Sequence, residues 1–186
     1  MNEISQLDRF DASWASIERR EGQTLNQLRS IATVKSVGAS TRIEGSQMTD
    51  AEVEALLRDL SISKLEERHQ QEVAGYFKCL ELITESYSNI DITETSILHL
   101  HNLMMKHSAK DEWHKGKYKQ HSNVVEKNSP GGDRQVIFQT TEPGFATEDA
   151  MRKLIEWYHS DTKTMRLIKV AVFVYDFFEH SPIPGW

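Results

Sequence analysis

Cysteine, proline, glycine and long apolar runs are all scarce in this chain of 186 residues. A single cysteine, Cys79, excludes an internal disulfide and any zinc site built from several cysteines, and it favours a reducing compartment, which we expect to be the cytoplasm. Four prolines and nine glycines argue against a low-complexity chain. The longest apolar run, 165–178, contains three charged residues and is too short to span a bilayer, so we expect no membrane partner.

Basic residues are in the minority. The chain has 22 Lys and Arg against 28 Asp and Glu, a formal net charge of −6. A general nucleic-acid-binding protein presents a basic face to the phosphate backbone, so we expect no nucleic-acid partner. The length fits one domain or one domain with an appendage, and a chain of this size buries roughly 70% of its unfolded surface, enough for a hydrophobic core.

Apolar residues recur at helical spacing through most of the sequence. The pattern predicts a first helix over about 8–33, a helix over 64–88, one capped at Thr93 or Thr95, and one starting at Thr147. Thr49 and Glu52 have the spacing of a capping box, which predicts a further helix start. The last helix, from about residue 163, is apolar nearly all round, so we expect other helices to enclose it.

Glycines and prolines interrupt the helical pattern between residues 110 and 144. The run Gln135-Val-Ile-Phe-Gln-Thr-Thr141 lies among them and is rich in β-branched and aromatic residues, which predicts one arm of a β-hairpin. The predicted fold class is therefore mainly α with a small β-hairpin. No internal repeat and no linker between domains is evident.

Three isolated features suggest chemistry but favour structural roles. The histidines between 99 and 121 lack the spacing of a zinc-binding helix face, so we expect no metal site. Cys79 lies beside an apolar helix face and is expected to be a buried small residue rather than a nucleophile. Lys115, Lys117 and Lys119 surround Tyr118 in a basic patch that could touch phosphate, although a solvated loop is the preferred interpretation.

The segment Ser40-Thr-Arg-Ile-Glu44-Gly45 predicts a specific helix ending. Ser40 and Glu44 are four residues apart, which puts them on one helix face, and Gly45 is suited to a left-handed stop. A carboxylate at the C-terminal end of a helix is disfavoured by the helix dipole, so Glu44 needs a cationic partner or exposure to solvent. The alternative is an ordinary surface helix end with a glycine cap.

This segment, together with two others, resembles the Fic (Fido) family of protein adenylyltransferases. Ser40–Gly45 matches the family's inhibitory-helix pattern. Lys115-Gly-Lys-Tyr-Lys119 followed by the strand and the next helix resembles the flap region, and Lys169-Val-Ala-Val-Phe-Val-Tyr-Asp176 resembles the helix before the catalytic loop. The resemblance implies an N-terminal helical region over 1–62 with an inhibitory helix at about 37–45, a partial Fic domain over 63–177, and a Fic-like helical bundle incomplete at its C-terminus.

The resemblance also implies a function. The parent activity is AMPylation, the Mg-dependent transfer of AMP from ATP to a Ser, Thr or Tyr hydroxyl of a target protein. Glu44 is implied as the autoinhibitory residue that occupies the place of the ATP γ-phosphate, helped by Ser40 and Gly45. The hairpin is implied to dock the target by β-strand addition, through the residues Val136, Ile137, Phe138, Gln139 and Thr140.

The C-terminal sequence departs from the family. Active members continue into His-Pro-Phe-x-[Asp/Glu]-Gly-Asn-Gly-Arg, whereas this chain reads Asp176-Phe-Phe-Glu-His-Ser-Pro-Ile-Pro-Gly-Trp186. Deleting one T from a permitted back-translation gives Asp-Phe-Leu-Ser-Ile-His-Pro-Phe-Gln-Asp-Gly, so we expect a frameshift, with 178–186 as an out-of-frame tail. His180 is not aligned with the catalytic histidine. We therefore expect no catalytic residue, no bound ATP or Mg, no activity, and exposed apolar surface on the last helix.

Two other functions stay open. The chain could be an antitoxin-like regulatory module that supplies Glu44 to an intact Fic relative, or act within a homodimer. It could also be a helical interaction protein unrelated to the Fic family.

Overall fold

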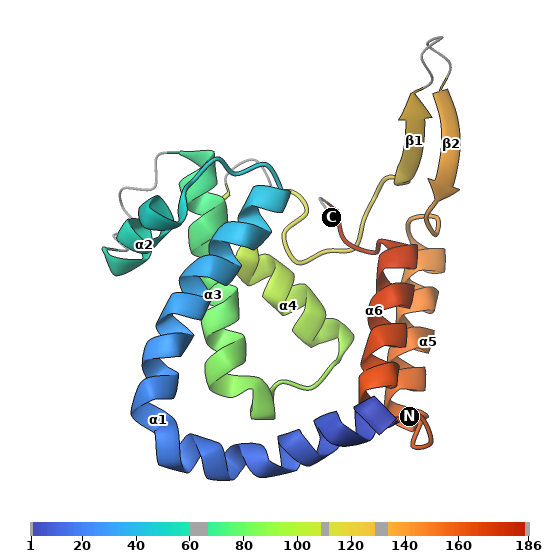
Figure 1. The fold of residues 1–186 in the computed structure, drawn as a ribbon. Coiled ribbons are helices and arrows are strands. Elements are labelled where there is room, and N and C mark those ends of the chain that lie inside the picture. The colour runs from blue at the N-terminus through green and yellow to red at the C-terminus, as the bar shows by residue number, and fades with distance from the viewer. Residues whose placement is uncertain (1, 60–66, 109–111, 129–133, 185–186) are drawn as a thin grey trace. The chain divides into compact units, whose positions relative to one another are not determined.

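The computed structural model describes residues 2–59, 67–108, 112–128 and 134–184. The chain divides into two compact units, Met1–Glu81 and Leu82–Trp186, which are described separately. Helices dominate both units, and the described strands form one two-stranded sheet in the second unit (Figure 1). The predicted mainly-α class is confirmed.

The first unit contains α1 (Asn2–Ile43), α2 (Asp50–Arg58) and most of α3 (Arg68–Ser86). α1 extends well beyond the predicted end at residue 33 because Val34 and Val37 continue its apolar side into the core. It kinks at Glu21, where φ is −113° and ψ is 18°, next to Gly22. The expected start of α3 at about residue 64 lies outside the described residues.

Three valines form the centre of the first unit's core. Val37 of α1, Val53 of α2 and Val73 of α3 are completely buried, and further apolar side chains pack around them. Each buried valine contributes roughly 1.5–3 kcal/mol. The capping box at the start of α2 is confirmed, with Thr49 accepting from the Glu52 amide and Glu52 accepting from the Thr49 amide. The three buried valines hold the end of α1 against α2 and α3.

The second unit contains the end of α3, a 3₁₀ turn (Tyr87–Asn89), α4 (Glu94–Met104), β1 (Val124–Asn128), β2 (Arg134–Gln139), α5 (Phe145–Ser160) and α6 (Arg166–His180). The predicted helix cap at Thr93 is confirmed. β1 and β2 pair antiparallel with an irregularity between Val125 and Glu126, which confirms the predicted hairpin. The hairpin extends beyond the ends of α5 and α6 (Figure 1).

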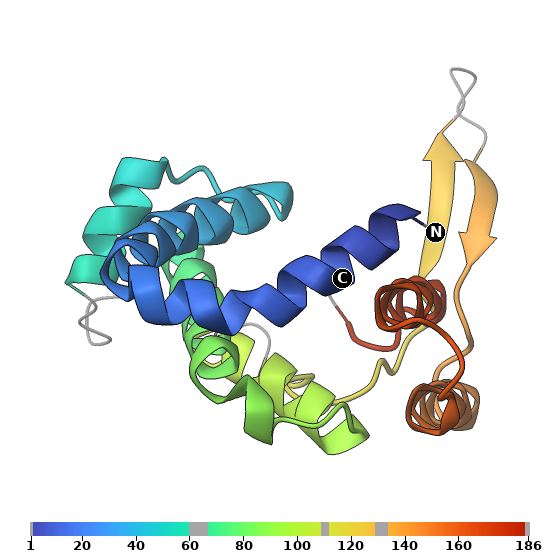
Figure 2. The ribbon, with the colours of Figure 1, turned by 60° about the horizontal axis from the view of Figure 1, so that its bottom comes forward.

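α5 and α6 lie side by side in both ribbon views (Figures 1 and 2). The ring centres of Tyr158 and Phe173 lie 5.2 Å apart, and Lys169 Nζ lies 4.6 Å from the centre of the Tyr158 ring. Within the second unit, the expectation that other helices enclose α6 is not met: α6 packs mainly on α5, and none of its residues is fully buried. Its exposed apolar residues are Leu167, Ile168, Val170, Val172, Val174, Tyr175 and Phe178.

No helix among the described residues has both the length and the hydropathy that crossing a membrane requires.

Candidate functional site

The end of α1 has the predicted glycine stop. α1 ends at Ile43, Glu44 and Gly45 form a turn, and Gly45 has a φ of 95°, which only glycine adopts easily. The Gly45 amide donates to the Arg42 carbonyl at 3.1 Å, and the Ser46 amide donates to the Thr41 carbonyl at 2.9 Å. Glu44 therefore lies at the end of the helix, directly after its last residue.

Ser40 and Glu44 have different surroundings. Ser40 is half-buried and accepts a hydrogen bond from the Tyr76 hydroxyl of α3 at 3.0 Å. Glu44 is exposed, and no described residue of the first unit forms a hydrogen bond or an ion pair with it. Ser40 thus anchors the end of α1 inside the first unit, while Glu44 presents a carboxylate to solvent.

Arg42 lies between these two residues and was missed by the sequence analysis. Its Nη1 donates to the Met48 carbonyl at 3.0 Å, and its Nη2 lies 2.8 Å from Oδ1 of Asp50. The signal that could have found it is the pairing of a cation in the last turn of one helix with an anion in the first turn of the next. Arg42 therefore spans the turn that carries Glu44.

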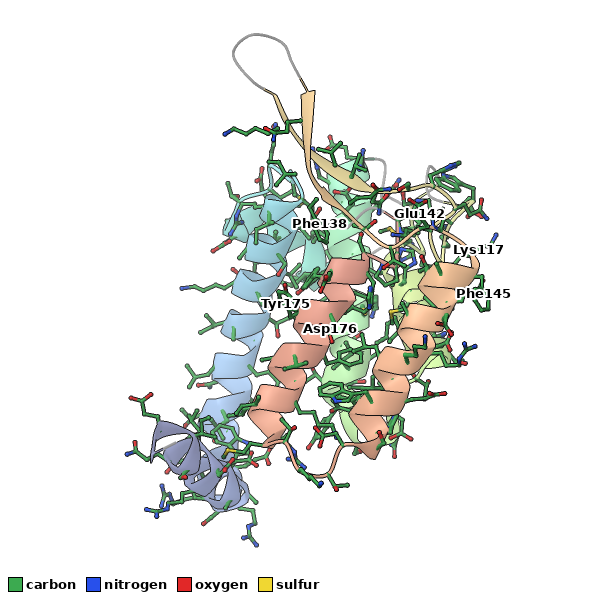
Figure 3. The ribbon with its side chains drawn as sticks, turned by 90° about the vertical axis from the view of Figure 1, so that its right-hand side faces the viewer. Lys117, Phe138, Glu142, Phe145, Tyr175 and Asp176 are labelled. Carbon is green, nitrogen blue, oxygen red and sulfur yellow. The ribbon has the colours of Figure 1, made fainter. Side chains whose placement is uncertain are left out.

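The predicted target-docking residues do not all share one environment. Val136, Ile137, Phe138 and Gln139 are exposed on β2, with Phe138 labelled in Figure 3. Thr140 lies just after β2 and is buried. Its hydroxyl donates to the Asn123 carbonyl at 2.9 Å and accepts from Lys119 Nζ at 2.6 Å. Thr140 thus belongs to the packed base of the hairpin, not to its exposed edge.

The solvated-loop interpretation is wrong for Lys119. Only 3% of this residue is exposed, and its Nζ donates to Thr140 and, at 2.9 Å, to the His180 carbonyl at the end of α6. Burial lowers the pKa of its ammonium group. Lys117 is exposed, and Lys115 is partly covered and pairs with Glu112. The three lysines therefore do not form one basic patch.

The residues after α6 pack against the base of the hairpin. Ser181 adopts a left-handed conformation with φ of 40° and caps α6, and Pro182 and Ile183 are buried. The Lys119 amide donates to the Pro182 carbonyl at 2.8 Å, and His180 Nδ1 lies 2.8 Å from the Thr141 hydroxyl. This stretch falls in the segment expected to be an out-of-frame tail.

A groove of about 560 Å³ lies between α5 and α6. Figure 3 shows Phe145 at the start of α5 and Asp176 on α6 on either side of it. Its lining mixes aromatic, acidic and basic side chains, namely Phe145, Asp149, Lys153, Trp157, Asp176 and His180. The lining of the groove therefore combines apolar surface with side chains of both charges, and neither charge dominates.

The described residues that could bind a metal ion lie apart from one another. Among them, no group of His, Cys, Asp and Glu is placed to hold a metal ion. His101 and His114 are buried with their rings stacked at 5.8 Å, and His101 Nδ1 accepts from the Gly116 amide. Cys79 is buried, and burial raises the pKa of its thiol.

Comparison with known proteins identifies the fold. No protein-family model matches the sequence, and a search of curated proteins finds no match. A Fic domain-containing signaling protein from Bacteroides thetaiotaomicron is similar in structure, with a TM-score of 0.70 and 19% identity over 95% of this chain and 65% of that one.

Two structures of Fic-1 from C. elegans are also similar, both at 14% identity. One, a Glu-to-Gly variant, has a TM-score of 0.60 over 98% of this chain and 54% of its own. The other has a TM-score of 0.57 over 92% and 57%. The chain thus spans about two thirds of the bacterial structure and little more than half of the C. elegans ones. Over nearly its whole length, the chain has the fold of Fic-domain proteins.

Proposed function

We propose that the chain is a Fic-family protein with an inhibitory helix ahead of its Fic domain. The parent activity is AMP transfer from ATP to a hydroxyl of a target protein. The observation that carries the proposal is the position of the Ser40–Gly45 pattern, which ends a helix with a left-handed glycine in a chain of Fic-domain fold. The same fold match argues against an unrelated helical interaction protein.

In this proposal Glu44 is the inhibitory carboxylate. It is exposed beside the C-terminal end of α1, where the helix dipole adds partial negative charge, so a cationic partner stabilises it. An arginine side chain can bind a carboxylate through two parallel hydrogen bonds. In the Fic family, which the segment Ser40–Gly45 resembles, such an arginine belongs to the catalytic loop, and its pair with the glutamate occupies the place of the ATP γ-phosphate.

The exposed edge of β2 is the proposed target-docking surface. Val136, Ile137, Phe138 and Gln139 are exposed in a two-stranded hairpin, and such an edge can add an extended peptide as a further strand. Thr140 is excluded from this role because it is buried and hydrogen-bonded to Lys119.

We further propose that these 186 residues transfer no AMP by themselves. They do not contain the family's histidine base, its metal-binding carboxylate or its glycine-rich phosphate loop, which together supply most of the electrostatic stabilisation of the transition state. The test is incubation of the chain with Mg and ATP labelled on the α-phosphate, with an intact Fic adenylyltransferase as positive control. We expect no labelled protein, and labelling at the rate of the control would refute the proposal.

A second candidate function is inhibition in trans. Glu44 is exposed without a partner among the described residues of the first unit, and this unit has its own core, which leaves the carboxylate available to another protein. The test adds the chain to a Fic adenylyltransferase whose own inhibitory Glu is replaced by Gly. The wild-type chain should slow AMP transfer, and Glu44→Gln should not. Glu54→Gln, an exposed glutamate of α2, is the matched control and should inhibit like the wild type.

A further inference from the structure

One arginine side chain spans the turn that carries Glu44, and backbone hydrogen bonds to the Thr41 and Arg42 carbonyls also hold this turn. The Arg42 guanidinium donates to the Met48 carbonyl and pairs with the Asp50 carboxylate, at 3.0 and 2.8 Å. These two contacts join the last turn of α1 to the first turn of α2. The residues between them, Glu44 included, are therefore held at both ends.

Gly38 provides the space in which this arginine lies. A Cβ atom built on Gly38 would lie 2.8 Å from Arg42 Nη1 and 2.9 Å from Asp50 Oδ1, closer than real Cβ contacts allow. The guanidinium thus passes directly over the backbone one helical turn before its own Cα. We call Gly38, Arg42, Met48 and Asp50 the Arg42 bracket.

The bracket orders the turn more than it stabilises the chain. Arg42 and Asp50 have side chains that are 38% and 47% exposed, and exposed ion pairs contribute little to global stability. Their placement is nevertheless favourable, because a cation in the last turn and an anion in the first turn both complement helix dipoles. The guanidinium also holds its hydrogen-bond donors in one rigid plane, so its two contacts fix the orientation of the group. A lysine ammonium has rotatable donors and does not do this.

We propose that Arg42 is a positioning residue that fixes the inhibitory Glu44 in its projecting orientation before any partner binds. This inference rests on the proposed inhibitory role of Glu44. Because no described residue of the first unit forms a hydrogen bond or ion pair with the Glu44 carboxylate, the backbone of the turn decides where that carboxylate points. A turn held in place avoids the entropy cost of ordering Glu44 when it meets a cationic partner.

The first test measures backbone order on the full chain by ¹⁵N relaxation. In the wild type the amides of residues 44–47 should have order parameters near roughly 0.85, and in Arg42→Met they should fall below about 0.6. Gly38→Ala should produce a smaller loss, because the atoms that its Cβ would displace are the ends of the flexible Arg42 and Asp50 side chains. Alanine is otherwise the better helix former, so a loss of order would not come from helix propensity. Arg42→Lys should restore order only in part. The control is Arg58→Met, which removes an exposed ion pair with Glu54 on α2 and should leave the turn unchanged.

Unchanged order in both Arg42→Met and Gly38→Ala, with the chain still folded by its amide spectrum, would overturn the inference. If Arg42→Met does not fold, Gly38→Ala and Arg42→Lys decide the question. This result does not depend on whether the chain inhibits in trans.

The second test repeats the trans-inhibition assay with the same variants. Arg42→Met should inhibit roughly tenfold less well than the wild type, the loss expected when a group must be ordered on binding. If Glu44→Gln inhibits like the wild type, the proposed role of Glu44 fails whatever Arg42 does. If Glu44→Gln loses inhibition while Arg42→Met keeps it in full, the role of Glu44 stands and the positioning role of Arg42 falls.

Discussion

Lys119 joins the base of the hairpin to the end of α6, and its replacement by methionine tests that junction. Lys119 Nζ donates to Thr140 Oγ1 at 2.6 Å and to the His180 carbonyl at 2.9 Å. The ammonium lies at the C-terminal end of α6, where the helix dipole favours a cation. Methionine has a similar length and no charge, so the variant removes both hydrogen bonds without leaving a large cavity.

The expected loss follows from these contacts. Hydrogen bonds to charged groups contribute about 1.5–3 kcal/mol each, and the His180 carbonyl would lose its bond from this ammonium. Against this, burying an ammonium is costly, and methionine regains apolar contact. We expect a net loss of about 2 kcal/mol. For a chain of this size each kcal/mol shifts the melting temperature by roughly 2–4 °C, which gives a fall of about 4–8 °C.

The assay is thermal unfolding followed by circular dichroism, together with hydrogen exchange at residues 140–141 and 181–183. Because the chain has two units, exchange shows where stability is lost even when unfolding is not two-state. The control is Lys117→Met, since Lys117 is exposed and donates only to the Trp113 carbonyl at 3.2 Å. A Lys119→Met variant that melts with the wild type, or a control that loses as much, would refute the reasoning.

We also expect the effect of Lys119→Met on stability to depend on pH. Burial lowers the pKa of Lys119 in the folded chain, whereas the unfolded chain keeps the ordinary value of 10.5. Between these two values the unfolded state binds more protons, so stability rises with pH. The difference in stability between the wild type and Lys119→Met should therefore grow as the pH is raised through this window, and a difference that shrinks would contradict the buried cation.

Three further predictions concern other parts of the chain. Thr49→Ala removes one half of the capping box and should lower stability by about 1 kcal/mol, while Thr49→Ser should retain it; equal urea midpoints for all three proteins would contradict the cap. Burial raises the pKa of the Cys79 thiol, so a thiol reagent at pH 8 should react roughly tenfold or more slowly with the native chain than with the urea-unfolded chain, and equal rates would place Cys79 at the surface. Sequencing the gene across the codons for residues 176–186 and downstream should find a Fic motif in a shifted reading frame; its absence from every frame would end the frameshift hypothesis.

Sequence alone determined the features that depend on neighbours a few residues apart. The capping box at Thr49, the cap at Thr93, the hairpin strand and the left-handed Gly45 were all predicted and are all present. Each follows from local physics: a side chain reaches the next turn's amides, or a missing Cβ permits a positive φ. The order of these segments was also sufficient to suggest the Fic-like fold that the comparisons identify.

Tertiary structure decided which side chains are buried and which residues they contact. The spacing of Ser40 and Glu44 predicted one shared face, but Ser40 is bonded to Tyr76, 36 residues away in sequence. Lys119 looked like part of a solvated loop and is buried against His180, 61 residues away. Such contacts depend on how helices pack, and no local periodicity encodes them.

The last helix gives the clearest division between the two levels. Its sequence predicted a helix from about residue 163 that is apolar on nearly every side, and the structure has this helix at Arg166–His180. Whether that surface is covered depends on which elements pack against it, and among the described residues of the second unit α6 packs mainly on α5. The hydrophobicity of this helix thus determined that burial of its surface is favourable. Only the arrangement of the neighbouring elements decided how much of that surface is buried.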